Sequence, residues 1–381
     1  MEVREVDPVL LSYVYDDDQR LEWSAGRIES WDAALVRVET ECGLVGWGEA
    51  GHALTGTRAV ESIVEALRPQ VVGRDPREAI DIRTELYDRN VFWARGGLPT
   101  GVIGAIEIAL YDVWAQDEGV PVYKLLGGGS PSVRVYGSGG IAATVEDRVA
   151  QAASIADEGF DVVKVRALGE PMANVAYVES LVEEVDAELA FDAVQGSAGD
   201  PWPVKDAIRL GRELERFADR LYWYEEPCRA ENLDGFRRVR DEIDLPVTGI
   251  ESRTGRYEHR DVVDAGAVDV LQPDVTISGG FSETKRISGY AASHDVPVAM
   301  HVWGTGVSLL ANAHYGATDP NCRSVEYCRL PNPLREEMLP ESVDREGNTL
   351  TLPDEPGLGV DISEEFLETH AFVPGKGHVF H

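Results

Sequence analysis

Seven short apolar runs between residues 160 and 326, each ending in ionisable side chains, constrain the fold of this chain most strongly. One of them is LYWYEE, Leu221–Glu226, and another is FDVVKVR, which ends in Lys164 and Arg166. The other five runs end at Asp192, Glu251, Asp274, His301 and Glu326. From Lys164 the intervals are 28, 33, 26, 23, 27 and 25 residues, each the length of one strand plus one helix. Alternating strands and helices of this length predict a parallel β/α barrel whose strand ends, and therefore whose active site, meet at one rim.

The segments outside this series predict a second module. Alternating strand patterns in residues 1–50 indicate an antiparallel hairpin or meander, and residues 57–90 have helical periodicity. The nearly apolar segment Val102–Glu118 predicts a buried helix. We therefore expect an N-terminal module at 1–128, a barrel at 129–330, and a tail at 331–381 that packs back on the N-terminal module.

The charge balance excludes several classes of partner. The 68 acids and 35 bases give a formal net charge of −33, which argues against nucleic acid and anionic membranes. The acids are spread over most helical segments, as expected of a surface adapted to high salt. Four cysteines without metal-type spacing, and no recognisable signal peptide, predict reduced thiols in a cytoplasmic protein. We also expect no apolar run of transmembrane length.

Three carboxylates end three successive predicted strands. Asp192, Glu225 and Glu251 would converge without His or Cys, a donor set that suits a hard cation, Mg²⁺ or Mn²⁺. The alternative is that these acids form salt bridges with bases at the rim. Glu226 follows Glu225 directly, so strand alternation predicts that it points away in a structural or supporting position.

The remaining strand ends carry groups suited to proton transfer and anion binding. A carboxylate such as Asp274 beside His301 would fix the imidazole tautomer and raise its basicity, which makes a general base. Lys164 and Arg166 lie two residues apart on one strand, so both face the lumen, where they would bind substrate oxygens. Lys164 is an alternative base if its pKa is depressed. Glu326 would either donate a hydrogen bond to an oxyanion or pair with a rim base.

An ordered set of motifs covers nearly the whole chain: GWGEA, ALYDVWAQDEGVPVYKLLGG, KVR, FDA, YWYEEP, GIES, QPD, MH, VEY and PGLGVDI. In these motifs the chain resembles the mandelate racemase branch of the enolase superfamily. The resemblance implies a (β/α)₇β modified TIM barrel, with an α+β capping domain built from the N-terminal region and the C-terminal tail.

The resemblance also implies roles for the strand-end residues. Asp192, Glu225 and Glu251 would hold Mg²⁺, which chelates a substrate carboxylate. Asp274 and His301 would form the base, and the family abstracts the proton α to the carboxylate to give an enediolate. Lys164 would occupy the family's Lys-x-Lys position, and Glu326 would be the acid on the oxyanion side. We expect a small-molecule substrate and a homo-oligomer.

Two departures from the family pattern favour one reaction. Arg166 stands where racemases have a second lysine base, and Val194 replaces a polar residue two positions after Asp192. We therefore predict a sugar-acid dehydratase in which His301 alone moves the proton. The alternatives are a racemase, epimerase or cycloisomerase, and a relative without activity. A polar loop at Asp16–Ser30 and the segment Gly51–Arg58, with Trp23 and His52, would select the substrate.

Overall fold

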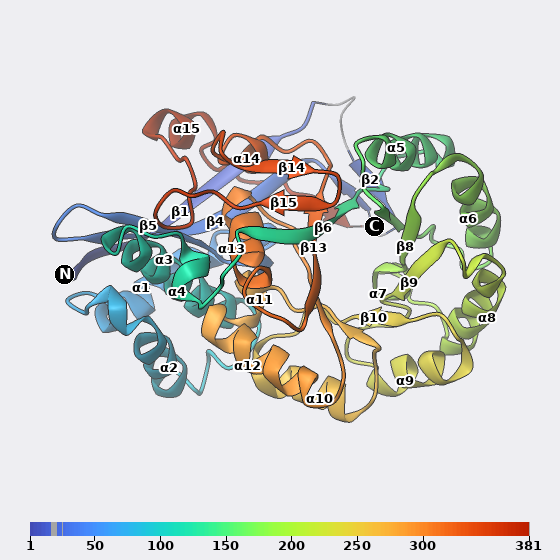
Figure 1. Ribbon diagram of the computed structural model, residues 1–381, viewed down its shortest axis with the longest axis horizontal. Helices are drawn as coiled ribbons and strands as arrows, with labels where there is room; N and C mark the ends of the chain where they lie inside the picture. Colours follow the sequence, from blue (N-terminus) through green and yellow to red (C-terminus); the bar gives the residue numbers. More distant parts are fainter. Residues whose placement is uncertain (17–20, 25, 381) are drawn as a thin grey trace.

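The structure, a computed structural model, describes residues 1–16, 21–24 and 26–380. The middle of the chain, residues 132–328, forms a parallel barrel (Figure 1). The barrel strands are β6 (Ser132–Ser138), β7 (Val162–Arg166), β8 (Glu188–Asp192), β9 (Leu221–Glu225), β10 (Val247–Gly249), β11 (Val270–Leu271), β12 (Val298–Met300) and β13 (Cys322–Cys328). Each strand pairs in parallel with the next, and β13 closes on β6 with Val325 opposite Val135. This confirms the predicted eight-stranded parallel barrel.

Helices connect successive strands around the outside of the barrel (Figure 1). They are α5 (Val145–Asp157), α6 (Ala173–Glu184), α8 (Val204–Leu214), α9 (Leu233–Glu242), α10 (Gly255–Asp264), α12 (Phe281–Ala292) and α13 (Gly306–Gly316), with short turns α7 (Val194–Ser197) and α11 (Val275–Ser278) at the rim. In α9 the Asn232 side chain accepts a hydrogen bond from the Gly235 N–H, and Phe236 and Val239 are buried. The lumen is packed by Tyr136, Trp223 and smaller side chains, so functional groups are confined to the rim.

The N-terminal part has a three-stranded antiparallel sheet, β1 (Val3–Val14), β4 (Ser30–Thr40) and β5 (Val45–Glu49), as the alternating pattern predicts. Helices α1 (Ala59–Leu67), α2 (Ala79–Arg89) and α3 (Leu98–Asp117) follow. Helix α3 corrects one expectation, because its length and hydropathy are sufficient to cross a membrane. In this protein, however, 83% of the 18-residue apolar stretch of α3 is buried. Helix α3 is therefore a core helix, which explains why it is apolar on all sides.

The C-terminal segment contributes to two sheets. After α14 (Pro333–Glu336), strands β14 (Asp344–Glu346) and β15 (Thr349–Thr351) form an antiparallel hairpin, and β15 pairs with β6 of the barrel. Helix α15 (Glu364–Thr369) is followed by β16 (His378–Phe380), which pairs with β3 (Gly26–Ile28). β3 pairs in turn with β2 (Leu21–Trp23). The segment predicted as a polar loop therefore contains two short strands, while positions 17–20 and 25 lie outside the described residues.

Buried polar contacts join the N-terminal sheet and helices to the barrel. Glu49 at the end of β5 accepts hydrogen bonds from the Thr305 and Ser308 N–H groups at the start of α13. Arg83 of α2 pairs with Glu283 of α12 at 3.1 Å, and both side chains are at most 2% exposed. The N-terminal sheet and helices are thus held against the barrel by charge-assisted contacts as well as by apolar packing.

Candidate active site

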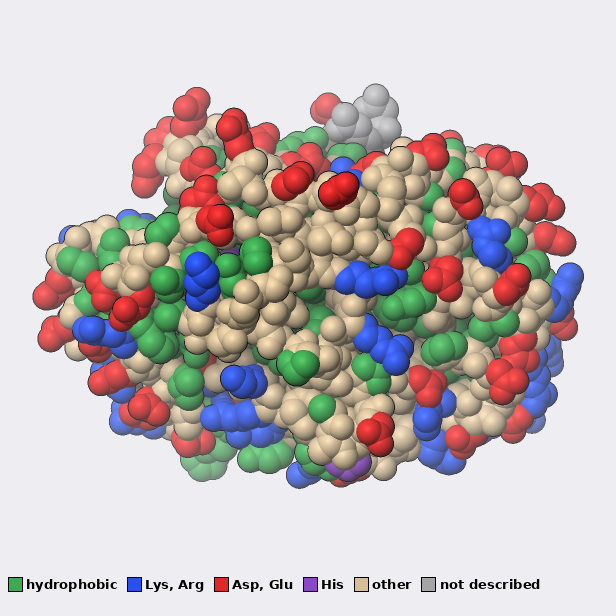
Figure 2. Space-filling model, in the orientation of Figure 1, with side chains coloured by type: hydrophobic (Ala, Val, Ile, Leu, Met, Phe, Trp, Pro, Cys, Tyr) green, Lys and Arg blue, Asp and Glu red, His purple; other side chains and the backbone are tan. Residues whose placement is uncertain are grey.

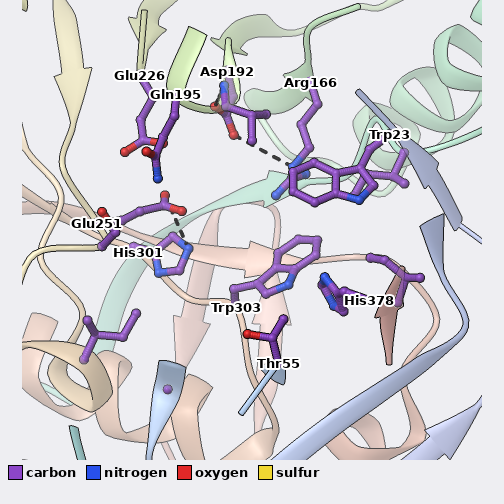
Figure 3. Close-up of a pocket in the computed structure, with 16 residues that line it drawn as sticks. Trp23, Thr55, Arg166, Asp192, Gln195, Glu226, Glu251, His301, Trp303 and His378 are labelled. Atoms are coloured by element: carbon purple, nitrogen blue, oxygen red, sulfur yellow. Dashed lines mark hydrogen bonds and ion pairs between the residues drawn. The ribbon is translucent and has the colours of Figure 1, made fainter. Parts of the chain in front are cut away.

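A cavity of about 360 Å³ lies at the rim formed by the barrel strand ends (Figure 3). Four of the predicted site residues line it: Arg166, Asp192, Glu251 and His301. The other four, Lys164, Glu225, Asp274 and Glu326, are buried behind this surface at 0–1% exposure. The strand-end residues therefore form two layers, one that faces the cavity and one that lies beneath it.

Lys164 is the centre of the buried layer. Its Nζ atom lies 2.9 Å from Glu225 Oε1, 2.9 Å from Glu326 Oε1 and 3.7 Å from Asp192 Oδ2. Burial by itself would lower the pKa of Lys164, but the Glu225 and Glu326 charges outweigh burial and hold it well above its usual range. Lys164 is therefore a fixed cation in this arrangement, which disfavours the alternative in which it acts as a base.

Glu326 shares this ion pair. Burial raises the pKa of Glu326, but Lys164, His301 and Arg166 outweigh burial and lower it to about 2. An ionised Glu326 balances charge beneath the cavity and has no proton to donate. The geometry thus favours the second of the two roles considered for this residue.

The carboxylates of the predicted metal set lie within electrostatic reach of one another. Burial raises the pKa values of Asp192, Glu225 and Glu251, and each is raised further by another member of the set. Across the described rim, five buried acids and the partly exposed Glu251 face only Lys164, Arg166 and His301 as bases. Such a surplus of desolvated hard oxygen donors suits a divalent cation. In the parts of the chain that the structure describes, however, no three His, Cys, Asp or Glu side chains are already arranged to hold a metal ion.

Glu226 corrects the prediction from strand alternation. β9 ends at Glu225, and Glu226 has a positive φ of 46°, a left-handed conformation that turns its side chain into the cavity. Its Oε1 accepts a hydrogen bond from the Ile250 N–H at 3.3 Å. Glu226 therefore adds a third acid to the cavity wall that contains Asp192 and Glu251 (Figure 3).

Asp274 and His301 form the predicted pair. His301 Nδ1 lies 3.0 Å from Asp274 Oδ2, while Asp274 Oδ1 accepts hydrogen bonds from the Thr276 N–H and hydroxyl and from Asn312 Nδ2. Asp274 is therefore fixed in orientation, and the imidazole directs Nε2 toward Glu251 Oε2, 3.4 Å away. Burial lowers the pKa of His301, but the Glu251 charge and the Asp274 hydrogen bond outweigh burial and raise it to about 9.

Arg166 presents a positioned cation to the cavity. It donates a hydrogen bond to the Gly139 carbonyl at 2.6 Å, and its guanidinium carbon lies 4.3 Å from the centre of the Trp303 ring. Its Nε is 3.8 Å from Asp192 Oδ2. Stacking and hydrogen bonding hold the guanidinium plane in a geometry suited to carboxylate or hydroxyl oxygens.

The wall opposite the acids is largely aromatic, with Trp23, Trp303 and His378 (Figure 3). Trp23 and Thr55 come from the two segments expected to select the substrate, whereas the His52 side chain lies outside the described residues. Sequence reasoning missed Trp303, although its position two residues after His301 was a usable signal. It also missed His378, which reaches the cavity only because β16 pairs with β3.

Two protein-family models together match most of the chain. Residues 147–366 match the family model described as enolase C-terminal domain-like, and residues 13–127 match the mandelate racemase / muconate lactonizing enzyme N-terminal domain. The chain belongs to the enolase superfamily.

Its relatives in this superfamily include enzymes of two kinds. The chain is 34% identical over 366 residues to the D-galactarolactone cycloisomerase of Agrobacterium fabrum, covering 92% of this chain and 94% of the relative. It is 29% identical over 347 residues to the arabinonate dehydratase of Saccharolobus solfataricus, covering 89% and 90%.

Solved structures of superfamily members share the fold. The 3,6-anhydro-D-galactonate cycloisomerase from Zobellia galactanivorans aligns with a TM-score of 0.87 at 27% identity, covering 98% of this chain and 100% of the other. A racemase from Streptomyces coelicolor, solved with bound magnesium, has a TM-score of 0.85 at 26% identity, covering 97% and 100%. Magnesium therefore occurs in a protein of the same fold.

Proposed function

We propose that this protein is a Mg²⁺-dependent hydro-lyase for a sugar acid, an aldonate or aldarate. It would remove the proton α to the carboxylate and eliminate the β-hydroxyl as water, leaving a 2-keto-3-deoxy acid. The observation that carries the proposal is the oriented Asp274–His301 pair, which faces a cavity lined by Arg166 on one side and by acids on the other. Similarity to the arabinonate dehydratase supports the reaction class.

Asp192, Glu225 and Glu251 would hold the Mg²⁺ ion, with Mn²⁺ as the alternative. The support is their shared surplus of buried negative charge. A bound divalent cation supplies charge that stabilises the anion formed when the α-proton leaves. Lys164 remains beneath these acids and limits their mutual repulsion, because it contacts Glu225 directly.

His301 would carry the proton through both half-reactions. Its Nε2 takes the α-proton as the C–H bond breaks, and Asp274 stabilises the resulting imidazolium. The imidazolium then returns the proton to the β-hydroxyl as the C–O bond breaks, so that water leaves and the enol product tautomerises to the keto acid. Because one residue performs both proton transfers, the α-proton and the β-hydroxyl must lie on the same face of the substrate. A cation bound at Glu251 would counter the largest charge that raises the pKa of His301, and so favour the neutral base.

The two walls of the cavity would bind different parts of the substrate. Arg166 would bind carboxylate or hydroxyl oxygens near the reacting carbons. The carbon chain beyond them would extend toward Trp23, Trp303 and His378, whose ring faces suit the C–H surface of a sugar acid. The net charge of −33 and four free cysteines favour a soluble cytoplasmic enzyme adapted to high salt, without nucleic-acid or membrane partners.

Screening a library of sugar acids with Mg²⁺ in molar salt, with detection of keto acids, tests the reaction class. The His301→Asn variant, incubated with the active substrate in D₂O, tests the mechanism, and His294→Asn at an exposed histidine is the matched control. We expect loss of both dehydration and α-exchange in His301→Asn alone. Retained α-exchange without dehydration would show that another residue removes the proton.

A cycloisomerase or racemase is the second candidate, favoured by the 34% identity to the A. fabrum cycloisomerase. It would share the first proton transfer. Turnover that exchanges the α-proton, inverts the α-carbon and yields no keto acid would select a racemase. Conversion of a lactone substrate without release of water would select a cycloisomerase.

A further inference from the structure

The short turn α7, just after β8, has left-handed backbone. Five consecutive residues have positive φ angles: Val194 (47°), Gln195 (54°), Gly196 (68°), Ser197 (63°) and Ala198 (57°). The Ala198 N–H donates to the Val194 carbonyl at 2.8 Å, which closes the turn. L-residues other than glycine adopt this conformation singly and at a cost in free energy, so a complete left-handed turn is strained. Strain of this kind is concentrated at binding and catalytic sites.

Contacts with the end of β9 hold this turn in place. The Gly196 N–H donates to the Glu226 carbonyl at 2.8 Å, and the Trp202 N–H donates to the Gly196 carbonyl at 2.9 Å. A Cβ atom at Gly196 would lie 3.0 Å from the Pro227 carbonyl oxygen, so the two backbones are in close contact. Glu226 itself has a positive φ of 46°. Two left-handed segments, which follow two neighbouring strands, therefore support each other at the cavity wall.

The Gln195 side chain lines the cavity, and its amide is oriented. The Ala230 N–H donates to Gln195 Oε1 at 3.4 Å. The amide nitrogen, which carries two donor N–H groups, therefore faces the cavity, and Figure 3 shows the Gln195 side chain directed toward Glu251. Because the turn is fixed, this donor is oriented before a ligand binds, which lowers the entropy lost on binding.

The charge of the molecule leaves the choice among sugar acids to neutral contacts of this kind. Figure 2 shows acidic side chains at many positions on the visible face, and the chain carries a net charge of −33. The resulting field acts on the carboxylate, which all sugar acids share, and molar salt screens it. Hydroxyl groups differ in number and configuration between sugar acids. Hydrogen bonds to hydroxyl groups are therefore the contacts that distinguish one sugar acid from another.

A hydroxyl group matches Gln195 and Glu226 together. Its oxygen can accept a hydrogen bond from Gln195 Nε2 while its hydrogen is donated to a Glu226 carboxyl oxygen. A carboxylate has no proton to donate to Glu226, and it would add negative charge to a wall that already contains Asp192 and Glu251.

We propose that Gln195 and Glu226 form a subsite for one hydroxyl group of the substrate, in which Gln195 determines specificity. The inference rests on the proposed function for the class of substrate, a polyhydroxy acid. The strained turn then has a function, because it holds the Gln195 amide in the cavity beside Glu226.

Calorimetric titration of the His301→Asn variant with Mg²⁺ in molar KCl tests the subsite, because binding is then measured without turnover. The probes are the sugar acid that binds most tightly and its deoxy analogues, each of which lacks one hydroxyl group. Addition of Gln195→Gly should raise the Kd of the parent acid about tenfold. The Kd of one deoxy analogue should stay unchanged, because that analogue already lacks the contact. Gln195→Met, which keeps the side-chain length without the amide, should give the same pattern.

The melting temperature separates this role from a structural one. Glycine adopts a φ of 54° without strain, which offsets its greater freedom in the unfolded chain, so Gln195→Gly should not lower the melting temperature. Gln70→Gly is the matched control, in the 3₁₀ turn Arg68–Gln70 of the N-terminal part, and should leave every Kd unchanged.

Unchanged Kd values in both Gln195 variants would overturn the inference whatever the reaction. An equal rise for the parent acid and every deoxy analogue would overturn it in favour of a structural role for the turn. Weaker Mg²⁺ binding by Gln195→Gly without sugar acid would overturn it by making Gln195 a cation ligand. Failure of every sugar acid to bind would overturn the subsite together with the substrate class. The expected pattern of Kd values, with no keto acid formed by the unmodified enzyme, would support the subsite and refute the dehydratase reaction.

Discussion

The substitution Glu49→Gln tests how the capping sheet is locked to the barrel. Glu49 is 2% exposed, and its neighbours are donors: the Thr305 N–H and hydroxyl and the Ser308 N–H. Burial raises its pKa from 4.5 to about 7 in the folded protein, although these hydrogen bonds oppose the shift. The folded state therefore binds the Glu49 proton more tightly than the unfolded state does.

The sign and size of the effect follow from this difference. A raised folded pKa contributes stability that is fully present below pH 4.5 and is lost as the pH rises through 7. At about 1.4 kcal/mol for each pKa unit, the total is about 3 kcal/mol. Glutamine has nearly the same volume and does not titrate, so Glu49→Gln should lack this pH dependence. The stability of the unmodified protein relative to the variant should fall by about 2–3 kcal/mol from about pH 5 to about pH 8.

Urea unfolding in molar KCl, followed by tryptophan fluorescence across this pH range, measures the difference. A chelator in every sample excludes contributions from cation binding. Glu65→Gln, at an exposed position on α1, is the control and should run parallel to the unmodified protein. Parallel stability profiles for the unmodified protein and Glu49→Gln would refute the reasoning, because Glu49 would then titrate alike in both states.

Three further outcomes are expected. Chelation should abolish turnover and Mg²⁺ should restore it, while Glu225→Gln should lose both activity and metal binding in calorimetry; full activity after exhaustive chelation would contradict the proposed metal site. Melting temperatures in a KCl series should rise steeply toward molar salt, because screening relieves the repulsion of a −33 chain, and a flat series would count against adaptation to salt. Glu283→Ala should lower the free energy of unfolding by about 3–5 kcal/mol, because it leaves Arg83 buried without its partner 3.1 Å away. A change within about 0.5 kcal/mol, as at ordinary surface sites, would show that water replaces that partner.

Much of the candidate site was predictable because barrel geometry converts sequence order into position. Strand ends that recur at the spacing of a β/α unit must meet at one rim, so Asp192, Glu251 and His301 could be placed together without coordinates. The pairing of Asp274 with His301 followed from the same rule, since their strands are neighbours. The first 50 residues were likewise predicted as antiparallel strands from their period-two pattern.

Other features depended on local backbone geometry. Strand alternation placed Glu226 away from the cavity, but alternation ends with the strand, and a positive φ one residue later redirects the side chain. The sequence predicted that Lys164 and Glu225 share the rim. Whether they contact each other depends on side-chain packing in the buried layer beneath the cavity, where unpaired charge is costly.

Periodicity and composition were sufficient to predict the barrel, the order of its strand ends and the acidic surface. They could not predict which strand-end groups face the cavity and which neutralise one another below it, because this depends on how the folded chain packs. The tertiary structure also decided that His378, more than 350 residues from Trp23, shares a wall with it, since β16 pairs with β3 next to β2. Pairing between distant strands depends on the packing of the whole chain, and no local pattern of residues specifies it.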